Sequence, residues 1–244
     1  MSASRLFSPQ PLRSQTELVL GKEQARYIGR VLRLQQGDEV VLFDGSGAEY
    51  PATITSISRE RVGLLVQNAV TRSVESPLDV RLVQGVSRGE RMDIVVQKAT
   101  ELGVTRVVPV LTENGVVKLD ADRSRKREAH WQRIAISACE QCGRNVVPKV
   151  DAIQPLADWL AEPSRQDDTR IVLDPASPEA LTSIASSKSH VTLLVGPEGG
   201  LSEVEYRQSQ ACGYVRASFG PRILRTETAA IAAVCAVQIA WGDC

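Results

Sequence analysis

The sequence of 244 residues lacks a long apolar run, an excess of charge of either sign and any cluster of histidines. No apolar run reaches about 18 residues, so a membrane span is not expected. The first nine residues contain no apolar core of a secretory signal, so we expect a cytoplasmic protein. Lysine and arginine total 29, as do aspartate and glutamate, which excludes a polycation that coats nucleic acid through bulk charge.

The sequence also lacks a recognisable metal site or nucleophilic triad. The two histidines, His130 and His190, are isolated from any serine or cysteine in a recognisable arrangement. Cys139 and Cys142 form a C-x-x-C pair, but it falls late in an expected helix with no second pair. We therefore expect incidental, reduced thiols and no bound metal. With Cys212, Cys235 and Cys244 the chain has five cysteines, an odd and scattered set that is typical of a reducing compartment.

The N-terminal part of the chain has the pattern of a small β-barrel-like domain. Apolar or alternating segments predict strands at 39–43, 52–57 and 62–66, and one helix is expected from Lys22 to Leu34. The segment 71–77 is polar and ends in proline, so we place a linker there. The chain is thereby divided into domains at 1–72 and 73–244.

After the linker, strands alternate with helices, which predicts an α/β domain with a parallel sheet. Short, wholly apolar runs at 171–173 and 191–195 are typical of central parallel strands. In such sheets, ligands bind beyond the carboxyl ends of the strands. Further strands are expected at 80–86 and 106–111, and helices at 91–102 and around the apolar stripe Trp131, Ile134, Ala135 and Ala138, ending near Gly143.

A glycine-rich loop, Gly196-Pro197-Glu198-Gly199-Gly200, follows the second of these apolar strands directly. Ser202 and Glu205 then form the pattern of a helix capping box, with Leu201 and Tyr206 as a hydrophobic staple. The loop lacks the lysine of a phosphate-binding loop, and Glu198 would repel a pyrophosphate. A site for a neutral or cationic ligand and a plain tight turn both remain open.

A second polar segment precedes a helix that is apolar on nearly all faces, from Ala229 to Trp241. Such a helix must be buried on several sides, by its own domain and by a partner subunit. The segment before it contains Arg222, Arg225 and Glu227, which form either a structural ion-pair cluster or a ligand site.

These two segments together resemble the SPOUT methyltransferases. The motifs are G-P-E-G-G at 196–200 and G-P-R-I-L-R-T-E-T-A at 220–229, supported by R-M-D at 91–93 and E-Q-C-G-R-N at 140–145. Within that superfamily the chain is similar to the bacterial small-subunit (16S) ribosomal RNA uracil-N3 methyltransferases, over essentially its whole length. It departs from the family pattern at Cys142 and in the absence of histidine at 24–28.

The resemblance implies a PUA-like barrel at 1–72 and a SPOUT domain with a C-terminal trefoil knot at 73–244. It further implies a homodimer that uses S-adenosylmethionine and acts on 16S ribosomal RNA or the small ribosomal subunit. Arg225 and Arg222 are then candidates for stabilising the uracil anion, and Glu227 for the base. The implied cofactor contacts are Leu173, Leu194, Gly196, Pro197, Glu198, Gly199, Ser218, Gly220, Ile223, Leu224 and Thr226.

The neutral total hides a net charge of +5 in residues 81–149 and −5 in residues 150–244, which by itself favours ordinary solvated helix faces. Because the resemblance implies an RNA substrate, basic residues are its expected contacts. Arg144 ranks first, and the helical run at 123–127 should contact phosphates. The complete set of candidates is Arg5, Arg30, Arg33, Arg88, Arg91, Lys98, Arg123, Arg125 and Arg144.

Two other functions stay open on the sequence. One is a SPOUT enzyme that methylates the ribose 2′-hydroxyl of RNA. The other is a non-catalytic RNA-binding factor for ribosome assembly. A nucleotide hydrolase is excluded, because the phosphate-binding lysine motif is absent.

Overall fold

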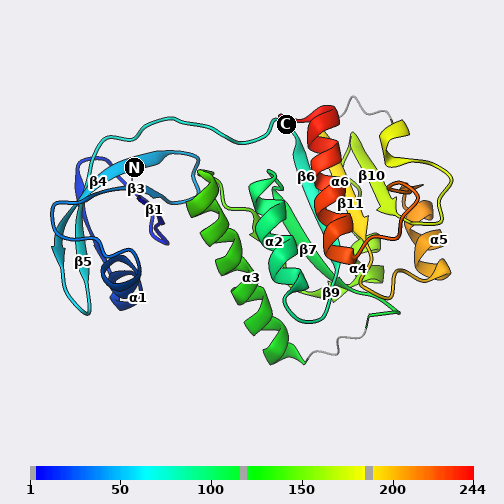
Figure 1. Ribbon diagram of the computed structural model, residues 1–244, viewed down its shortest axis with the longest axis horizontal. Helices are drawn as coiled ribbons and strands as arrows, with labels where there is room; N and C mark the ends of the chain where they lie inside the picture. Colours follow the sequence, from blue (N-terminus) through cyan, green and yellow to red (C-terminus); the bar gives the residue numbers. More distant parts are fainter. Residues whose placement is uncertain (1–3, 116–119, 185–188) are drawn as a thin grey trace. The chain divides into compact units, whose positions relative to one another are not determined.

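Strand pairing divides the chain between two separate sheets (Figure 1), which belong to two units. The computed structural model describes residues 4–115, 120–184 and 189–244. The first unit comprises residues up to Glu75 together with Cys139–Val147, and the second comprises Ser76–Ala138 and Pro148–Cys244. A short stretch near the middle of the sequence therefore packs with the N-terminal domain.

The first unit is built on a five-stranded sheet in the order β1-β3-β4-β5-β2. The β1–β3 pair is parallel and the other pairs are antiparallel. Alternate residues such as Val40, Leu42, Ile54 and Leu64 point into one apolar core, as the period of two requires. The strands are β1 (Ser4–Phe7), β2 (Thr16–Leu20), β3 (Glu39–Phe43), β4 (Glu49–Ile57) and β5 (Val62–Val66).

The helix expected from Lys22 to Leu34 is shorter in the structure. Helix α1 (Lys22–Arg26) continues as a π-helical turn over Tyr27–Val31, in which the Leu32 N–H donates to the Tyr27 carbonyl over 3.0 Å. Arg33 then adopts a left-handed conformation with φ of 57°. Because a left-handed residue cannot continue a right-handed helix, the element ends before Leu34.

Two arginines predicted to bind RNA have structural partners within the first unit. Arg144 is 3% exposed, and its guanidinium lies 2.7 Å from the Glu75 carboxylate. Arg5 is paired with Glu49 at 2.6 Å and donates to the Asn145 side chain over 2.6 Å. These contacts attach residues 139–147 to the barrel, and they give both arginines a role in packing, while their contact with RNA stays a prediction.

The second unit contains a parallel sheet in the order β12-β10-β11-β6-β7-β8, with β9 also paired to β7. The carboxyl ends of its strands therefore share one edge, where the pocket described below opens. The strands are β6 (Asp79–Gly85), β7 (Arg106–Leu111), β8 (Lys149–Val150), β9 (Gln154–Pro155), β10 (Asp168–Leu173), β11 (His190–Val195) and β12 (Val215–Ala217).

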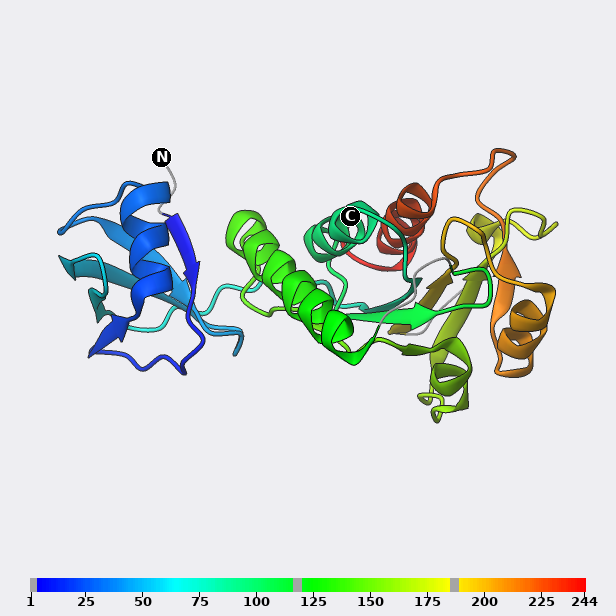
Figure 2. The ribbon, with the colours of Figure 1, turned by 90° about the horizontal axis from the view of Figure 1, so that it is seen from below.

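Helices cover this sheet on both faces. Helices α2 and α6 lie side by side (Figures 1 and 2), while Trp159 of α4 and Tyr206 of α5 pack with Val83, Val172 and Leu194 of the strands. The helices are α2 (Arg91–Glu101), α3 (Ala121–Cys142), α4 (Leu156–Ala161), the 3-10 turn Leu181–Ser183, α5 (Glu203–Ala211) and α6 (Thr226–Trp241). None of the helices within the described ranges has the length and apolar character needed to cross a membrane.

The predicted capping box at the start of α5 is confirmed, and it gives the first prediction. The Ser202 hydroxyl accepts from the Glu205 N–H over 3.1 Å, and the Glu205 carboxylate accepts from the Ser202 N–H over 2.8 Å. Substitution Ser202→Ala should lower the free energy of unfolding by about 1 kcal/mol in urea titration. Gln208→Ala on the exposed side of α5 is the control and should change it by less than about 0.5 kcal/mol. Equal effects of the two substitutions would contradict the role of the cap.

Candidate active site

A pocket of about 610 Å³ opens at the carboxyl edge of the parallel sheet. Three segments enclose it: the residues after β10, the glycine-rich loop after β11, and the segment from β12 to the first turn of α6. A volume of this size suits a cofactor-sized ligand. The two segments that carry the sequence motifs therefore share one cavity.

The glycine-rich loop folds closely upon itself and upon a neighbouring loop. A Cβ atom on Gly196 would lie 3.1 Å from the backbone of Gly200, and one on Gly199 would lie 2.8 Å from the carbonyl oxygen of Asn114. Gly200 has φ of 69°, in the left-handed region that favours glycine. Glycine at these positions lets the backbone itself form the wall of the pocket.

The Thr226 hydroxyl connects the glycine-rich loop to helix α6. It donates to the Gly196 carbonyl over 2.6 Å and accepts from the Gln84 side-chain amide over 2.9 Å. Gln84 and Thr226 are 0% and 6% exposed. The end of β6, the end of β11 and the start of α6 are distant in the sequence, and this buried hydroxyl connects them through its hydrogen bonds.

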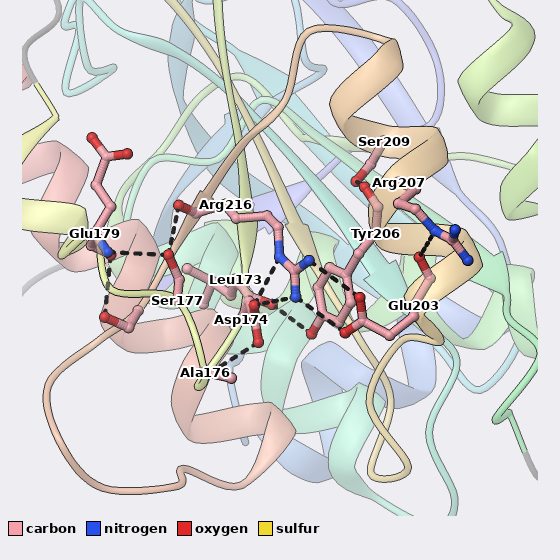
Figure 3. A network of polar contacts seen from close by, with 11 residues as sticks. Leu173, Asp174, Ala176, Ser177, Glu179, Glu203, Tyr206, Arg207, Ser209 and Arg216 are labelled. Carbon is pink, nitrogen blue, oxygen red and sulfur yellow. Dashed lines mark hydrogen bonds and ion pairs between the residues drawn. The ribbon is translucent and has the colours of Figure 1, made fainter.

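A second network forms the wall beside β10 and α5 (Figure 3). The Arg216 guanidinium lies 2.6 Å from the buried carboxylate of Asp174 and 3.2 Å from that of Glu203, and it stacks 4.3 Å above the Tyr206 ring. Burial, with the nearby charge of Asp174, raises the pKa of Tyr206 to about 12. The phenol therefore stays protonated and donates to the Leu173 carbonyl over 3.3 Å. Because Asp174 and Tyr206 both line the pocket, this network fixes its shape on that side.

On another side of the pocket, Arg91 of α2 lies between two carboxylates. Its guanidinium donates to Glu198 in a short hydrogen bond, and its Nε lies 3.7 Å from Oε2 of Glu227. The Arg88 N–H also donates to Glu198, over 2.9 Å. Partial burial alone would raise the pKa of Glu198, but these hydrogen bonds and the charge of Arg91 hold it below its usual value.

Most of the predicted cofactor and catalytic residues line this pocket. They are Leu173, Gly196, Pro197, Glu198, Gly199, Arg222, Ile223, Leu224, Arg225, Thr226 and Glu227. Three others do not contribute to its lining. Leu194 faces the α4–α5 side of the sheet and is part of the core, Ser218 hydrogen-bonds to the Glu179 backbone, and Gly220 turns the loop with φ of 70°.

The sequence interpretation missed four pocket residues with charged or aromatic side chains, namely Arg91, Asp174, Tyr206 and Phe219. Asp174 follows the apolar strand β10 directly, so an acid at a carboxyl strand end was the available signal. Phe219 follows β12, and Arg91 was assigned to RNA although it lines the pocket.

No group of three or more histidine, cysteine or acidic side chains in the described parts of the chain is arranged to hold a metal.

The other basic residues predicted to bind RNA differ in their exposure and in their ion-pair partners. Arg30, Arg33 and Arg88 are exposed, and Lys98 pairs with Glu101. Arg123 and Arg125 are exposed and pair with the aspartates three residues earlier, Asp120 just before α3 and Asp122 in its first turn. Arg30 also lines a hollow of about 640 Å³ on the barrel, which we call the basic groove, together with Lys22, Ala25, Arg26, Gly29, Leu34, Ile57, Ser58, Arg59 and Glu60.

Comparison with known proteins shows that the chain is similar to RNA methyltransferases. Family models of an RNA methyltransferase domain and of an RNA methyltransferase PUA domain match residues 74–238 and 20–66. A solved ribosomal RNA small subunit methyltransferase E from Neisseria gonorrhoeae, bound to S-adenosyl methionine, is 38% identical with a TM-score of 0.93 and covers 99% of both chains. A methyltransferase structure from Legionella pneumophila with bound SAM is 36% identical with a TM-score of 0.94 and covers both chains completely. Ribosomal RNA small subunit methyltransferase E of Buchnera aphidicola is 33% identical over 92% of this chain and 91% of its own.

The chain is therefore an RNA methyltransferase that joins a PUA domain to an α/β methyltransferase domain. More narrowly, it belongs to the ribosomal RNA small subunit methyltransferase E family. The predicted family, the predicted α/β fold with a PUA-like N-terminal domain and the predicted enzyme class are confirmed. These relatives favour small-subunit methylation over the 2′-O-ribose and non-catalytic alternatives.

The Thr226 hydroxyl supplies the prediction from this site. Thr226→Val removes the hydroxyl at nearly constant shape, and it leaves the Gln84 amide and the Gly196 carbonyl without this partner. We expect the free energy of unfolding to fall by about 1–3 kcal/mol in denaturant titration. Thr226→Ser keeps the hydroxyl and should retain most of the stability. If the valine and serine variants are equally stable, the hydroxyl does not hold the two loops together.

Proposed function

We propose that this protein transfers a methyl group from S-adenosylmethionine to N3 of a uridine in 16S ribosomal RNA. The observation that carries the proposal is the convergence of the two motif segments, 196–200 and 220–229, on one pocket in a chain of this methyltransferase family. The SAM-bound relatives support the choice of cofactor.

The pocket residues fit that cofactor. Asp174 and Glu198 provide negative charge for the sulfonium and ammonium groups, while the glycine backbone of 196–200 offers N–H and C=O groups at close approach. Leu173 and Leu224 supply apolar surface for a purine. When bound, S-adenosylmethionine supplies a methyl group on a positively charged sulfur, which makes it reactive towards nucleophiles.

The residues of the chain must make uracil N3 a nucleophile. N3 carries a proton at neutral pH, so a base has to remove it and cations have to stabilise the anion that results. Arg222 and Arg225 line the pocket beside the cofactor loops and are our candidates for contacting the uracil oxygens. N3 lies on the Watson–Crick edge, so the target base must be unpaired or turned out of its helix.

The assembly and the RNA contacts are also part of this proposal. Helix α6 leaves Ile239 65% exposed and Ile231 and Cys235 half-buried, which supports a homodimer that covers this apolar helix. We expect RNA phosphates along the basic groove and the small ribosomal subunit as the physiological partner. The trefoil knot and the cytoplasmic location stay predictions.

The role of Arg225 can be tested directly. Arg225→Ala should bind S-adenosylmethionine with an unchanged dissociation constant in calorimetry, yet lose about 100-fold or more in kcat, because it removes a cation that acts on the developing anion. Mass spectrometry of nucleosides from treated ribosomal RNA measures the product. Parent-like rates for this variant would remove Arg225 from the catalytic group.

The basic groove predicts salt-dependent RNA binding. The double variant Arg26→Glu, Arg30→Glu should weaken binding of 16S RNA and flatten the dependence of log affinity on log salt, because fewer counterions are released. Arg13→Glu, an exposed basic residue of the same domain outside the groove, is the matched control. The groove is not an RNA surface if both variants show the same salt slope as the parent in a filter-binding titration.

A further inference from the structure

Arg91 is shared unequally between the two carboxylates beside it. Its hydrogen bond goes to Glu198, whereas Glu227 faces it at 3.7 Å, which is an ion-pair distance too long for a hydrogen bond. Oε2 of Glu227 is buried and accepts no hydrogen bond from any described residue. One cation thus neutralises two acids while leaving one carboxylate oxygen with its lone pairs unused.

Glu198 and Glu227 differ in how many hydrogen bonds their carboxylates already accept. The Glu198 carboxylate is engaged by the Arg88 N–H and by Arg91, so it acts as an anchor for the arginine. Glu227 is the second residue of α6, a helix of 16 residues whose N-terminal dipole favours a negative charge there. Its side chain is 14% exposed and lines the pocket. A proton acceptor needs a carboxylate that borders the ligand pocket and is not already fully engaged by hydrogen bonds, and Glu227 meets both conditions.

We propose that Glu227 is the base that accepts the uracil N3 proton and that Arg91 is a positioning residue, held by Glu198, which orients this carboxylate. The inference rests on the proposed function. The N3–H bond breaks, the proton moves to the Glu227 carboxylate, and the electron pair stays on N3, which becomes the nucleophile. The protonated carboxyl then returns its proton to solvent.

Other charged groups line the same pocket. Arg222 and Arg225 lie on the loop before α6, and Asp174 follows β10. Those three groups are present in all the variants below. Differences among the variants therefore report on the shared arginine and its two carboxylates.

The test compares pH–rate profiles of Glu227→Gln, Arg91→Met and Glu198→Gln. Glu227→Gln should lower kcat by about 100-fold or more and keep the affinity for S-adenosylmethionine within about threefold. Arg91→Met removes the countercharge, so the acidic limb of the profile should move up by about one pH unit. Glu198→Gln removes the competing carboxylate, so the limb should move down. Opposite shifts are the signature of a shared cation, since general loosening of the pocket would not change direction with the sign of the removed charge.

Two control variants keep the charge change but place it outside the site. Arg207→Met on the exposed side of α5 and Glu101→Gln at the end of α2 should leave the profile unchanged. Parent-like kcat for Glu227→Gln, or shifts of Arg91→Met and Glu198→Gln in the same direction, would overturn the inference.

A second measurement does not depend on catalysis. In the unliganded protein with ¹³C-labelled glutamate, the carboxyl resonance missing from Glu227→Gln identifies this residue in NMR titrations. It should titrate at higher pH in Arg91→Met than in the parent, and at lower pH in Glu198→Gln. If these shifts occur but the parent forms no N3-methyluridine, the proposed function fails and the charge coupling stands. If the parent forms that product and Glu227→Gln does so equally fast, only the role of the base fails.

Discussion

The pocket depends on the buried hydrogen bonds of the Thr226 hydroxyl. This single group joins the carboxyl end of β11, through Gly196, to the first turn of α6 and to Gln84 at the end of β6. Because the three segments are more than 100 residues apart at their extremes, no local interaction could bring them together. An unpaired polar group at such a buried position costs free energy, so the network favours one relative placement of the two motif segments. The cavity between them follows from that placement.

The charges around the cavity show what kind of ligand it suits. Three arginines and three acidic residues line it: Arg91, Arg222, Arg225, Asp174, Glu198 and Glu227. Asp174 and Glu198 are already paired with arginines, so the walls are largely neutralised within the protein. A cofactor with a positive sulfur beside an apolar ring system suits the acidic residues. A nucleobase that becomes an anion when it loses its proton suits the arginines.

Much of this fold could be predicted because the local patterns are strong. The apolar runs of β10 and β11, the alternation in the barrel strands and the capping box of α5 each follow from residues close together in the sequence. The end of the first helix could not be predicted, because it depends on a π turn and a left-handed Arg33 within the barrel packing. The side that Leu194 faces was missed for a similar reason: both faces of a central parallel strand are apolar, so the sequence does not tell the pocket side from the core side.

The arginines illustrate why charge alone could not assign a site. Arg144, Arg5 and Arg91 belong to motif segments or basic stretches and carry the same charge as a surface residue, yet each has a carboxylate partner within its own unit. An arginine as buried as Arg144 or Arg5 would be too costly to retain without such a partner, so burial predicts a nearby acid. The acids that provide these partners, Glu75, Glu49 and Glu198, lie far away in the sequence and become visible only in the fold. RNA contact is therefore better sought among basic side chains that remain exposed, and Arg30 at the basic groove meets that condition.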